Sequence, residues 1–572
     1  MVTPLRSHLY VPADQSRLMN SATTSSADVL IFDLEDSVPS RRKAVGLDAV
    51  IDLVHALPAE RRRWVRINPG PAGLREADAV VDDPAGPDPL PPMSYTELDL
   101  QVRRIATTLA ARVPVGGRVA VIAPNSARLL QLMLAVPASG RILVPINFRL
   151  NAAEITYILE HSGADVVLAD PQLEPDVLAA LPEHQLLGPA TDQCWQADAP
   201  VPELRRLWDP DEDLVATINY TSGTTARPKG VALTHRAIWL DAVMFGLHAT
   251  VTDQDRYLHT LPLFHVNGWG LPYTMAGLGV TQYLQRRIDG AAILDRIRAD
   301  DITLMACAPA VLGIILDALE HGEPPSGRNQ VRVICAGAPP PSRIIERVEH
   351  ELGWEFIQIY GLTETAPLVT INRRPPGHEP RPPAQRAEQL AAAGAPCLGT
   401  RISLSPTGEV LVRSNHVLSE YRHDPQATAD ALADGWFHTG DGGTIDSAGR
   451  LTILDRKKDV IITGGENVSS AEVESALYRH PAVKDVAVIG VPDHRWGEAV
   501  KAVIVLKADQ AAEEADLIAF ARAALTHYKC PTSIDIVTDI PRTATGKIQK
   551  FKLREPYWLD LPQFREGMHY EE

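Results

Sequence analysis

The sequence has few cysteines and no long apolar stretch. Its five cysteines are widely spaced among 572 residues and form no Cys-x-x-Cys pair. This pattern excludes a disulfide-dense scaffold and a clustered zinc site, and it is typical of a reducing compartment. No apolar run approaches the ~18–20 residues that a membrane-spanning helix needs, and the N-terminal residues 1–17 lack the apolar core of a secretory signal. We therefore expect a cytoplasmic protein without a membrane span.

The sequence is also short of positive charge. It holds 55 lysines and arginines against 72 aspartates and glutamates, so its formal net charge is −17. An acidic surface argues against nonspecific binding to nucleic acid or to anionic membranes, while it leaves room for a locally basic site that binds an anionic substrate. Hydrophobic residues are 45% and charged residues 22% of the chain, the mix of a globular protein. Its length predicts three or four domains at ~100–200 residues each.

The patterning of apolar and polar residues divides the chain into four segments. Residues 1–70 alternate short apolar strands with a helix, and residues 71–93 contain six prolines, which predicts a linker. Residues 94–457 alternate strands with amphipathic helices, a pattern that indicates parallel sheets covered on both faces. A polar, proline-rich loop is predicted within this block at 373–389, and residues 458–572 form a smaller unit. The predicted fold class is α/β.

The strongest local signal is the segment 220–230, YTSGTTARPKG. Its hydroxyl side chains and glycines follow an apolar stretch and form a loop whose N–H and O–H groups can surround phosphate oxygens. Lys229 adds a cation, while the Walker A pattern is absent. From these residues alone, a flexible Ser/Thr/Gly turn is equally consistent with the segment.

The segment resembles the signature of the AMP-forming acyl-adenylating ligases, the acyl-CoA synthetase superfamily, which usually has glycine where this chain has Ala226. The resemblance covers about residues 94–555. Further motifs follow in the family's order: LPLFHVNGWG, ICAGAPPP, IYGLTETAP, DGWFHTGD, LDRKKDVIITGGENV and PRTATGKIQK. LFHVNGWGLPY is most similar to the fatty acyl-CoA branch. The resemblance implies a large N-terminal ligase domain of several subdomains with parallel sheets, residues 94–457. It also implies a small, mobile α+β C-terminal domain, residues 458–572.

The chemistry of this family explains the residue types of its phosphate site. A carboxylate is already ionised at pH 7, so it needs no general base to attack the α-phosphate of ATP. The obstacle is repulsion between two anions, which cations and oriented dipoles relieve. The resemblance implies that Thr363 meets the α-phosphate and that Glu364 and Thr224 hold Mg²⁺. It assigns the phosphates to the loop residues Thr221, Ser222, Gly223, Thr224, Thr225 and Lys229.

The resemblance also implies roles for four residues around the rest of the nucleotide. Tyr360 would pack on the adenine, Asp441 would accept hydrogen bonds from both ribose hydroxyls, and Arg456 would reach the ribose or phosphate region. Lys547 would bridge the substrate carboxylate and the α-phosphate during adenylation. Taken alone, each has an ordinary alternative: Asp441 is a typical turn aspartate, Glu364 can cap a helix, and Lys547 can be a solvated lysine.

Coenzyme A transfer is assigned to the C-terminal part of the chain. Lys458 matches the hinge about which family members rotate the C-terminal domain between the two half-reactions. Gly464 and Gly465 would then line the path of the thiol, because glycine permits close approach of a narrow pantetheine arm. Trp496 either contacts coenzyme A or packs as a partly buried tryptophan.

The acid is expected at the motif 261–270. His265, a catalytic candidate together with Lys547, Glu364 and Thr224, would face the carboxylate, and Trp269 resembles a gate of the acyl tunnel. Core packing is the alternative for Trp269. One wall of this pocket carries only small residues and is not filled by side chains: Ala336, Gly337 and Ala338.

The first 70 residues resemble the start of the citrate lyase β-subunit-like aldolases. This resemblance rests on three segments: RSHLYVPADQSRL, DVLIFDLEDSV and RWVRINPG. That family has a (β/α)₈ barrel of ~250 residues, so this chain carries an incomplete barrel fragment. The carboxylates that bind the family's metal have no counterpart here, and we expect no lyase activity. The open edges of such a fragment must pack against the ligase body or a second chain, as in a homo-oligomer formed through residues 1–90.

The sequence therefore predicts an enzyme that uses ATP, Mg²⁺ and coenzyme A. It would convert a carboxylic acid into acyl-AMP with release of pyrophosphate, and then pass the acyl group to a thiol, that of coenzyme A. Two alternatives stay open: another acceptor, namely a carrier-protein thiol or a nitrogen nucleophile, and a degenerate ligase that acts as a scaffold. The sequence does not identify the acid.

Overall fold

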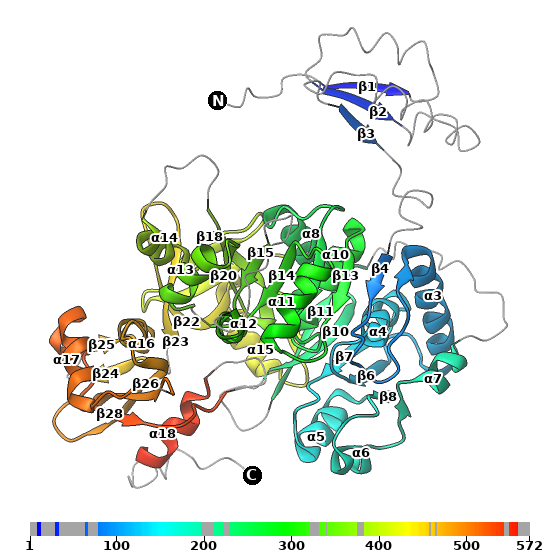
Figure 1. The fold of residues 1–572 in the computed structure, drawn as a ribbon. Coiled ribbons are helices and arrows are strands. Elements are labelled where there is room, and N and C mark those ends of the chain that lie inside the picture. Colours follow the sequence, from blue (N-terminus) through cyan, green and yellow to red (C-terminus); the bar gives the residue numbers. More distant parts are fainter. Residues whose placement is uncertain are drawn as a thin grey trace. The chain divides into compact units, whose positions relative to one another are not determined.

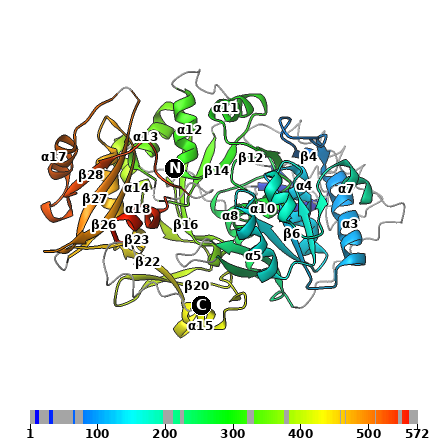
Figure 2. The same ribbon diagram turned by 90° about the horizontal axis from the view of Figure 1, so that it is seen from below.

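The structure is a computed structural model of the chain, shown from two directions in Figures 1 and 2. Two units make up the chain: residues 1–78 with 93–99, and residues 79–92 with 100–572. None of the helices in the described part is long and apolar enough to cross a membrane. The described ranges are 8–12, 29–33, 63–66, 78–195, 211–221, 228–319, 331–338, 340–374, 382–456, 459–463, 466–508, 510–542 and 548–558.

The first unit contains a small parallel sheet with the strand order β1-β2-β3. Its strands are β1 (His8–Pro12), β2 (Val29–Asp33) and β3 (Arg63–Arg66). Leu30 of β2 pairs with Leu9 on one side and Arg63 on the other. These are the three strands predicted for the aldolase-like fragment, while the helix predicted between the second and third strands lies outside the described residues.

A seven-stranded sheet of the second unit has the order β21-β11-β10-β7-β6-β8-β9. Strands β6, β7 and β8 are near-continuous apolar runs, as expected for parallel strands buried on both faces. Its strands are β6 (Arg118–Ile122), β7 (Ile142–Ile146), β8 (Val166–Ala169), β9 (Gln185–Leu186), β10 (Val215–Thr221), β11 (Lys229–Thr234) and β21 (Glu420–Tyr421). The helices that follow them along the chain are α4 (Ala127–Ala138), α5 (Ala152–Ser162), α6 (Pro175–Ala180), α7 (Pro189–Cys194) and α8 (His235–His248), and α3 (Tyr95–Arg112) precedes β6.

A second large sheet contains, in order, β18-β17-β16-β15-β14-β12-β13-β4. From β16 to β4 neighbouring strands pair in parallel, and β17 and β18 pair antiparallel. Its strands are β4 (Asp78–Val81), β12 (Arg256–His259), β13 (Thr281–Leu284), β14 (Leu304–Cys307), β15 (Arg332–Cys335), β16 (Glu355–Gly361), β17 (Leu368–Asn372) and β18 (Ala395–Pro396), and the short β5 is Met93–Ser94. Its helices are α9 (Val266–Trp269), α10 (Leu271–Leu278), α11 (Gly290–Ala299), α12 (Pro309–Leu319), α13 (Ser342–Glu351) and α14 (Pro383–Leu390).

Two smaller sheets follow along the chain. The first has the order β19-β20-β22-β23, and the second has the order β25-β24-β27-β26 with β28 paired to β27. Their strands are β19 (Arg401–Leu404), β20 (Glu409–Arg413), β22 (Phe437–Ile445), β23 (Leu451–Arg456), β24 (Ile461–Thr463), β25 (Glu466–Val468), β26 (Val483–Asp493), β27 (Gly497–Leu506) and β28 (Ser533–Ile536). The accompanying helices are α15 (Pro425–Ala431), α16 (Ser470–Tyr478), α17 (Glu514–Ala524) and α18 (Lys550–Trp558).

The predicted α/β class with parallel sheets is confirmed, but two predicted irregular segments contain regular structure. Within the expected linker 71–93, Val80 and Val81 form part of β4 and pair with β13, because the short apolar run DAVV outweighs the surrounding prolines. Within the expected loop 373–389, α14 begins at Pro383, since proline suits the first turn of a helix and good helix formers follow it.

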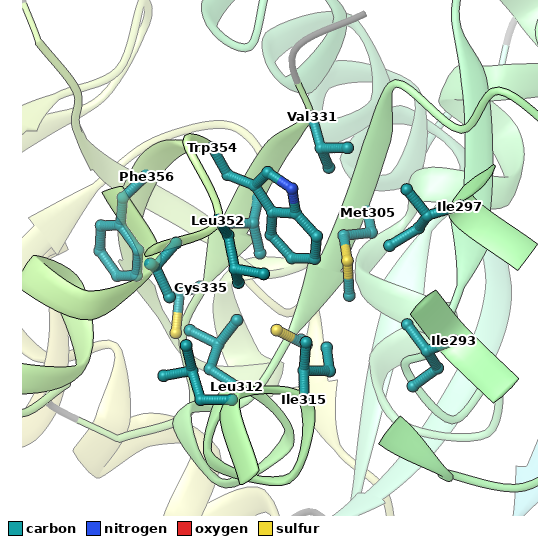
Figure 3. Packing of buried hydrophobic residues seen from close by; sticks show 14 of the residues in the cluster. Ile293, Ile297, Met305, Leu312, Ile315, Val331, Cys335, Leu352, Trp354 and Phe356 are labelled. Atoms are coloured by element: carbon teal, nitrogen blue, oxygen red, sulfur yellow. The ribbon is translucent and has the colours of Figure 1, made fainter. Parts of the chain in front are cut away.

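The core on one face of the second sheet supports the strand that leads to the predicted nucleotide site. Figure 3 shows Trp354 and Phe356, at the start of β16, among side chains from β14, α11 and α12. Burial of each such side chain stabilises the fold by ~1.5–3 kcal/mol, and it fixes β16 in place. The neighbours in this cluster include Ile293, Ile297, Met305, Leu312, Ile315 and Leu352.

Candidate active site

The predicted phosphate loop connects two antiparallel strands. Thr221, at the end of β10, pairs with Lys229, at the start of β11. Residues 222–227, with Ser222, Gly223, Thr224 and Thr225, lie outside the described residues, so their predicted roles remain predictions. The strand register nevertheless places the Lys229 ammonium group on the stem of this loop.

Both stems of the loop contact α5. The Tyr157 hydroxyl donates to the carbonyl of Pro228 at 3.4 Å, and Nδ1 of His161 lies 2.9 Å from the Tyr220 hydroxyl. Burial and the nearby positive side chain of Arg422 lower the pKa of His161, so it is mostly neutral at pH 7. The sequence reasoning missed these α5 residues because no family motif covers them.

The YGLTE segment runs from the end of β16 into a short 3-10 turn, Thr363–Thr365. Only glycine fits at Gly361, because a Cβ there would lie 1.5 Å from the carbonyl oxygen of Pro367. Thr363 is buried, and Glu364 is half-buried with its Oε1 accepting a 2.9 Å hydrogen bond from the Tyr421 hydroxyl. Burial, together with the Glu364 charge, raises the pKa of Tyr421, so its hydroxyl stays protonated and acts as the donor.

Three of the residues predicted to bind the nucleoside form one polar group. The Tyr360 hydroxyl donates to Oδ2 of Asp441 at 2.8 Å, and Nε of Arg456 lies 3.1 Å from Oδ1 of the same carboxylate. Asp441 is 5% exposed. A carboxylate has about four lone-pair sites, so Asp441 can accept hydrogen bonds from several donors at once. The pairing of Tyr360 with Asp441 was not predicted.

The acid motif has an unusual backbone. Every residue from Val266 to Gly270 has a positive φ, between 46° and 68°. For residues other than glycine, a left-handed conformation costs roughly 1–2 kcal/mol each, and such strain is found preferentially at functional sites. Gly270 is required here also because a Cβ would lie 2.3 Å from Oδ2 of Asp241, a fully buried carboxyl whose pKa burial raises well above its usual value.

Trp269 is 5% exposed and belongs to the same apolar cluster as Ala336. His265, at the start of α9, is half-buried, and Ala338 is half-buried too. Gly337 is exposed with a φ of 94°. The burial of Trp269 is compatible with both the gate and the packing interpretation.

A buried polar contact joins the acid motif to the phosphate strand. Nδ2 of Asn267 donates to Oγ1 of Thr217 at 3.1 Å, and Nδ2 of Asn219 donates to the same oxygen at 3.0 Å. Thr217 lies on β10, four residues before the loop stem Thr221. The two ends of the predicted site thus share one hydroxyl group.

Several predicted residues of the C-terminal part cannot be placed: Lys458, Gly464, Gly465 and Lys547 lie outside the described residues. The segment that carries Lys547 is closed by a β-bridge between Arg542 and Ile548. Trp496 is 47% exposed, between β26 and β27, with the Arg495 guanidinium 4.6 Å from its ring centre. Its exposure leaves the ring accessible, as a coenzyme A contact requires.

The residues present suit a magnesium–nucleotide complex. Mg²⁺ is usually held by one or two carboxylates together with substrate phosphates and water rather than by a protein cage. Glu364 supplies such a carboxylate, and only one of its oxygens is engaged by Tyr421. The described residues contain no cluster of three histidine, cysteine or acidic side chains that would form a protein cage for a metal.

Comparisons with known proteins show which families the chain matches. The AMP-binding enzyme family matches residues 73–422, its C-terminal domain matches residues 472–547, and the HpcH/HpaI aldolase/citrate lyase family matches residues 6–107. The ligase match begins before residue 94, in accord with the position of β4.

Relatives and solved structures extend the likeness over most of the chain. A 2-methylpropanoate–CoA ligase of Humulus lupulus is 36% identical over 77% of this chain and 86% of its own length, and a feruloyl-CoA synthase of an Amycolatopsis species is 35% identical over 81% and 94%. ATP-bound MatB from Rhodopseudomonas palustris superposes with a TM-score of 0.74 at 28% identity, over 85% of this chain and 97% of that one. The predicted family is confirmed: the chain belongs to the AMP-binding enzymes, and among them to the ligases that activate a carboxylic acid as acyl-AMP.

Proposed function

We propose that this chain is a magnesium-dependent acid–CoA ligase whose site is organised by the stretch from Tyr360 to Glu364. At one end of this stretch, Tyr360 contacts Asp441 of the predicted ribose group. At the other end, Glu364 contacts Tyr421, whose ring faces Lys229 of the phosphate loop. This connection between a nucleoside end and a phosphate end is the observation that carries the proposal.

In the first half-reaction, a carboxylate oxygen of the acid attacks the α-phosphorus of ATP. The bond from that phosphorus to the bridging oxygen breaks, and pyrophosphate leaves with the electron pair. Lys229 and Thr221 bind phosphate oxygens, and Lys547 offsets the charge that gathers between the carboxylate and the α-phosphate. Glu364 and Thr224 would hold Mg²⁺, and the bound ion would supply positive charge to offset that of the phosphates. In the second half-reaction, the coenzyme A thiolate attacks the acyl carbon, and AMP leaves.

The remaining predicted residues complete this proposal. Thr363 meets the α-phosphate and Arg456 the ribose or phosphate, while Ser222, Gly223 and Thr225 supply loop donors. His265 and Trp269 face the acid. Lys458 is the hinge of a mobile C-terminal domain, with Gly464, Gly465 and Trp496 along the coenzyme A path.

The acid itself is not assigned, because the two relatives named above carry the names of chemically different acids, one branched and aliphatic, the other aromatic. A screen of pyrophosphate release over acids of varied length and aromaticity identifies it. Acid-dependent release that needs ATP is expected for at least one acid. Pyrophosphate release that does not depend on any acid, or ADP in place of AMP, would contradict the proposal.

The acceptor is tested by titrating coenzyme A while AMP release is measured. We expect AMP release to rise with coenzyme A and to match acyl-CoA formed. Release driven instead by a carrier-protein thiol or by an amine would identify another acceptor, and absence of any adenylation would favour the scaffold alternative.

For the N-terminal fragment we propose a role in packing or assembly, not in chemistry. Its described part is three parallel strands, too few to close a (β/α)₈ barrel. A chain that begins at residue 78 should therefore keep its ligase activity, although its solubility can fall. No lyase activity should be lost, because the intact chain should have none. Carbon–carbon lyase turnover by the intact chain would contradict this role. The cytoplasmic location expected from the sequence stays a prediction.

A further inference from the structure

The segment from Leu418 to Asp424 lies against both the phosphate-loop stem and the Glu364 turn. Strand β21 pairs with β11, Val231 opposite Tyr421, and the Leu418 amide donates to the carbonyl of Glu364 at 2.7 Å. None of the motifs named in the sequence analysis covers this segment, and none of its residues was predicted to belong to the site.

Tyr421 is the residue of this segment that touches both charged groups. Its hydroxyl donates to Oε1 of Glu364 at 2.9 Å, and the Nζ of Lys229 lies 5.0 Å from the centre of its ring. The backbone of Tyr421 is held by a hydrogen bond from its amide to Oγ1 of Thr428 at 2.9 Å. Lys229 also pairs with Asp424, 3.5 Å away.

An ammonium group and a carboxylate that both face a phosphate site attract each other. A direct ion pair between Lys229 and Glu364 would withdraw both groups from an incoming magnesium–phosphate complex. A tyrosine offers a hydroxyl to the Glu364 carboxylate and a π face to the Lys229 ammonium, which pairs with Asp424 rather than with Glu364. It also leaves Oε2 of Glu364 open to a metal.

We propose that Tyr421 is a positioning residue that keeps the Glu364 carboxylate and the Lys229 ammonium apart and oriented toward the magnesium-bound phosphates of ATP. The inference rests on the proposed function, because it takes Glu364 as the metal ligand and Lys229 as a phosphate ligand. It adds a residue that acts through both without touching the reacting atoms.

The two contacts of Tyr421 can be removed separately. Tyr421→Phe removes the hydroxyl and keeps the ring, whereas Tyr421→Leu removes both. Binding of a non-hydrolysable ATP analogue is measured by calorimetry over a range of Mg²⁺ concentrations and without Mg²⁺. For Tyr421→Phe we expect the Mg²⁺ concentration at half-maximal binding to rise about three- to ten-fold, with metal-free binding unchanged. For Tyr421→Leu, metal-free binding should weaken as well, by about two- to five-fold.

The chain offers a matched control in Tyr557. Its hydroxyl also donates to a carboxylate, that of Asp535 in the sheet of the C-terminal part, so Tyr557→Phe removes the same type of bond elsewhere. This variant should keep the wild-type Mg²⁺ dependence, even where it unfolds at a lower temperature.

The outcomes separate the two proposals. If the wild type binds the analogue with Mg²⁺ and Tyr421→Phe shows the same Mg²⁺ dependence, the role of Tyr421 is overturned while the proposed function stands. A lower melting temperature alone would mean that Tyr421 is only structural. If the wild type binds no nucleotide at all, the proposed function is overturned, and the inference with it.

Discussion

The nucleotide end and the acid motif of this protein are built on opposite principles. Around Asp441 and Glu364, strands and a short turn present side chains that form hydrogen bonds and ion pairs. In the acid motif the backbone itself is left-handed for five residues, and most of its side chains are buried and apolar. Polar side chains thus dominate the predicted nucleotide site, whereas backbone conformation and apolar side chains dominate the predicted acid site.

Of the predicted changes, replacement of Lys547 should have the largest effect. It should slow only the half-reaction in which ATP is consumed. Lys547→Ala is expected to slow acyl-adenylate formation by about 10²–10³-fold, because a preorganised positive charge is lost from the transition state. Acyl-CoA formation from synthetic acyl-adenylate should stay close to the wild-type rate. Lys550→Ala is the control, since that lysine pairs with Glu474 at 2.8 Å. An equal loss in both half-reactions would show that Lys547 acts structurally.

Trp269 tests the acid motif. Trp269→Ala should cost about 3–5 kcal/mol of stability, because it empties a buried site, and it should change the preferred acid far more than the KM for ATP. Phe356→Ala, in the cluster of Figure 3, serves as the control that loses stability without a change of acid. An unchanged acid profile in Trp269→Ala would support the packing interpretation.

Asp441 tests whether the polar group is a nucleotide site. Asp441→Asn removes the charge that Arg456 faces and should lower kcat/KM for ATP about ten- to a hundred-fold, and it should also weaken the second half-reaction. Asp446→Asn is matched to it, because Asp446 forms an exposed pair with Arg450 at 2.8 Å after the same strand. Equal effects of the two variants would contradict the assignment.

The smallest predicted effect is a pH dependence of stability that comes from two buried histidines. Burial lowers the pKa of two histidines to about 4. His259 precedes the acid motif, and His416 donates a hydrogen bond to the carbonyl of Leu368. Because the unfolded pKa is near 6.5, the unfolded chain binds the proton first as the pH falls. Each histidine therefore contributes stability that is complete above pH 6.5 and is lost toward pH 4, by ~1.4 kcal/mol per pH unit.

Urea unfolding at pH 7.5 and pH 5 measures this dependence. His416→Gln and His259→Gln should each lose less stability than the wild type between the two pH values. The same loss in a variant as in the wild type would mean that the replaced histidine is not the titrating group.

The same contrast explains what could be predicted from the sequence. Roles could be predicted for Asp441, Arg456 and Glu364 because each lies in a short motif that can be recognised in the sequence. No role could be predicted for Tyr421, since it lies 57 residues from Glu364 and meets it only in the folded chain, where β21 pairs with β11 and the Leu418 amide bonds to Glu364.

The fold shows the same limit. The alternation of apolar runs with helical segments was enough to predict the parallel strands. Strand β4 and helix α14 were not predicted, because prolines lie next to them in the sequence. The left-handed turn at Val266 to Gly270 could not be predicted either, because valine and tryptophan ordinarily avoid that conformation, and only the tertiary packing holds them there.

The most direct test of the central claim follows oxygen. When the acid carries ¹⁸O in its carboxylate, attack on the α-phosphorus transfers one labelled oxygen to AMP, because the acyl–oxygen bond breaks when the thiol takes the acyl group. Mass spectrometry of the products should therefore find one ¹⁸O in AMP and none in pyrophosphate. Label in pyrophosphate or in inorganic phosphate, or AMP without label, would contradict the account.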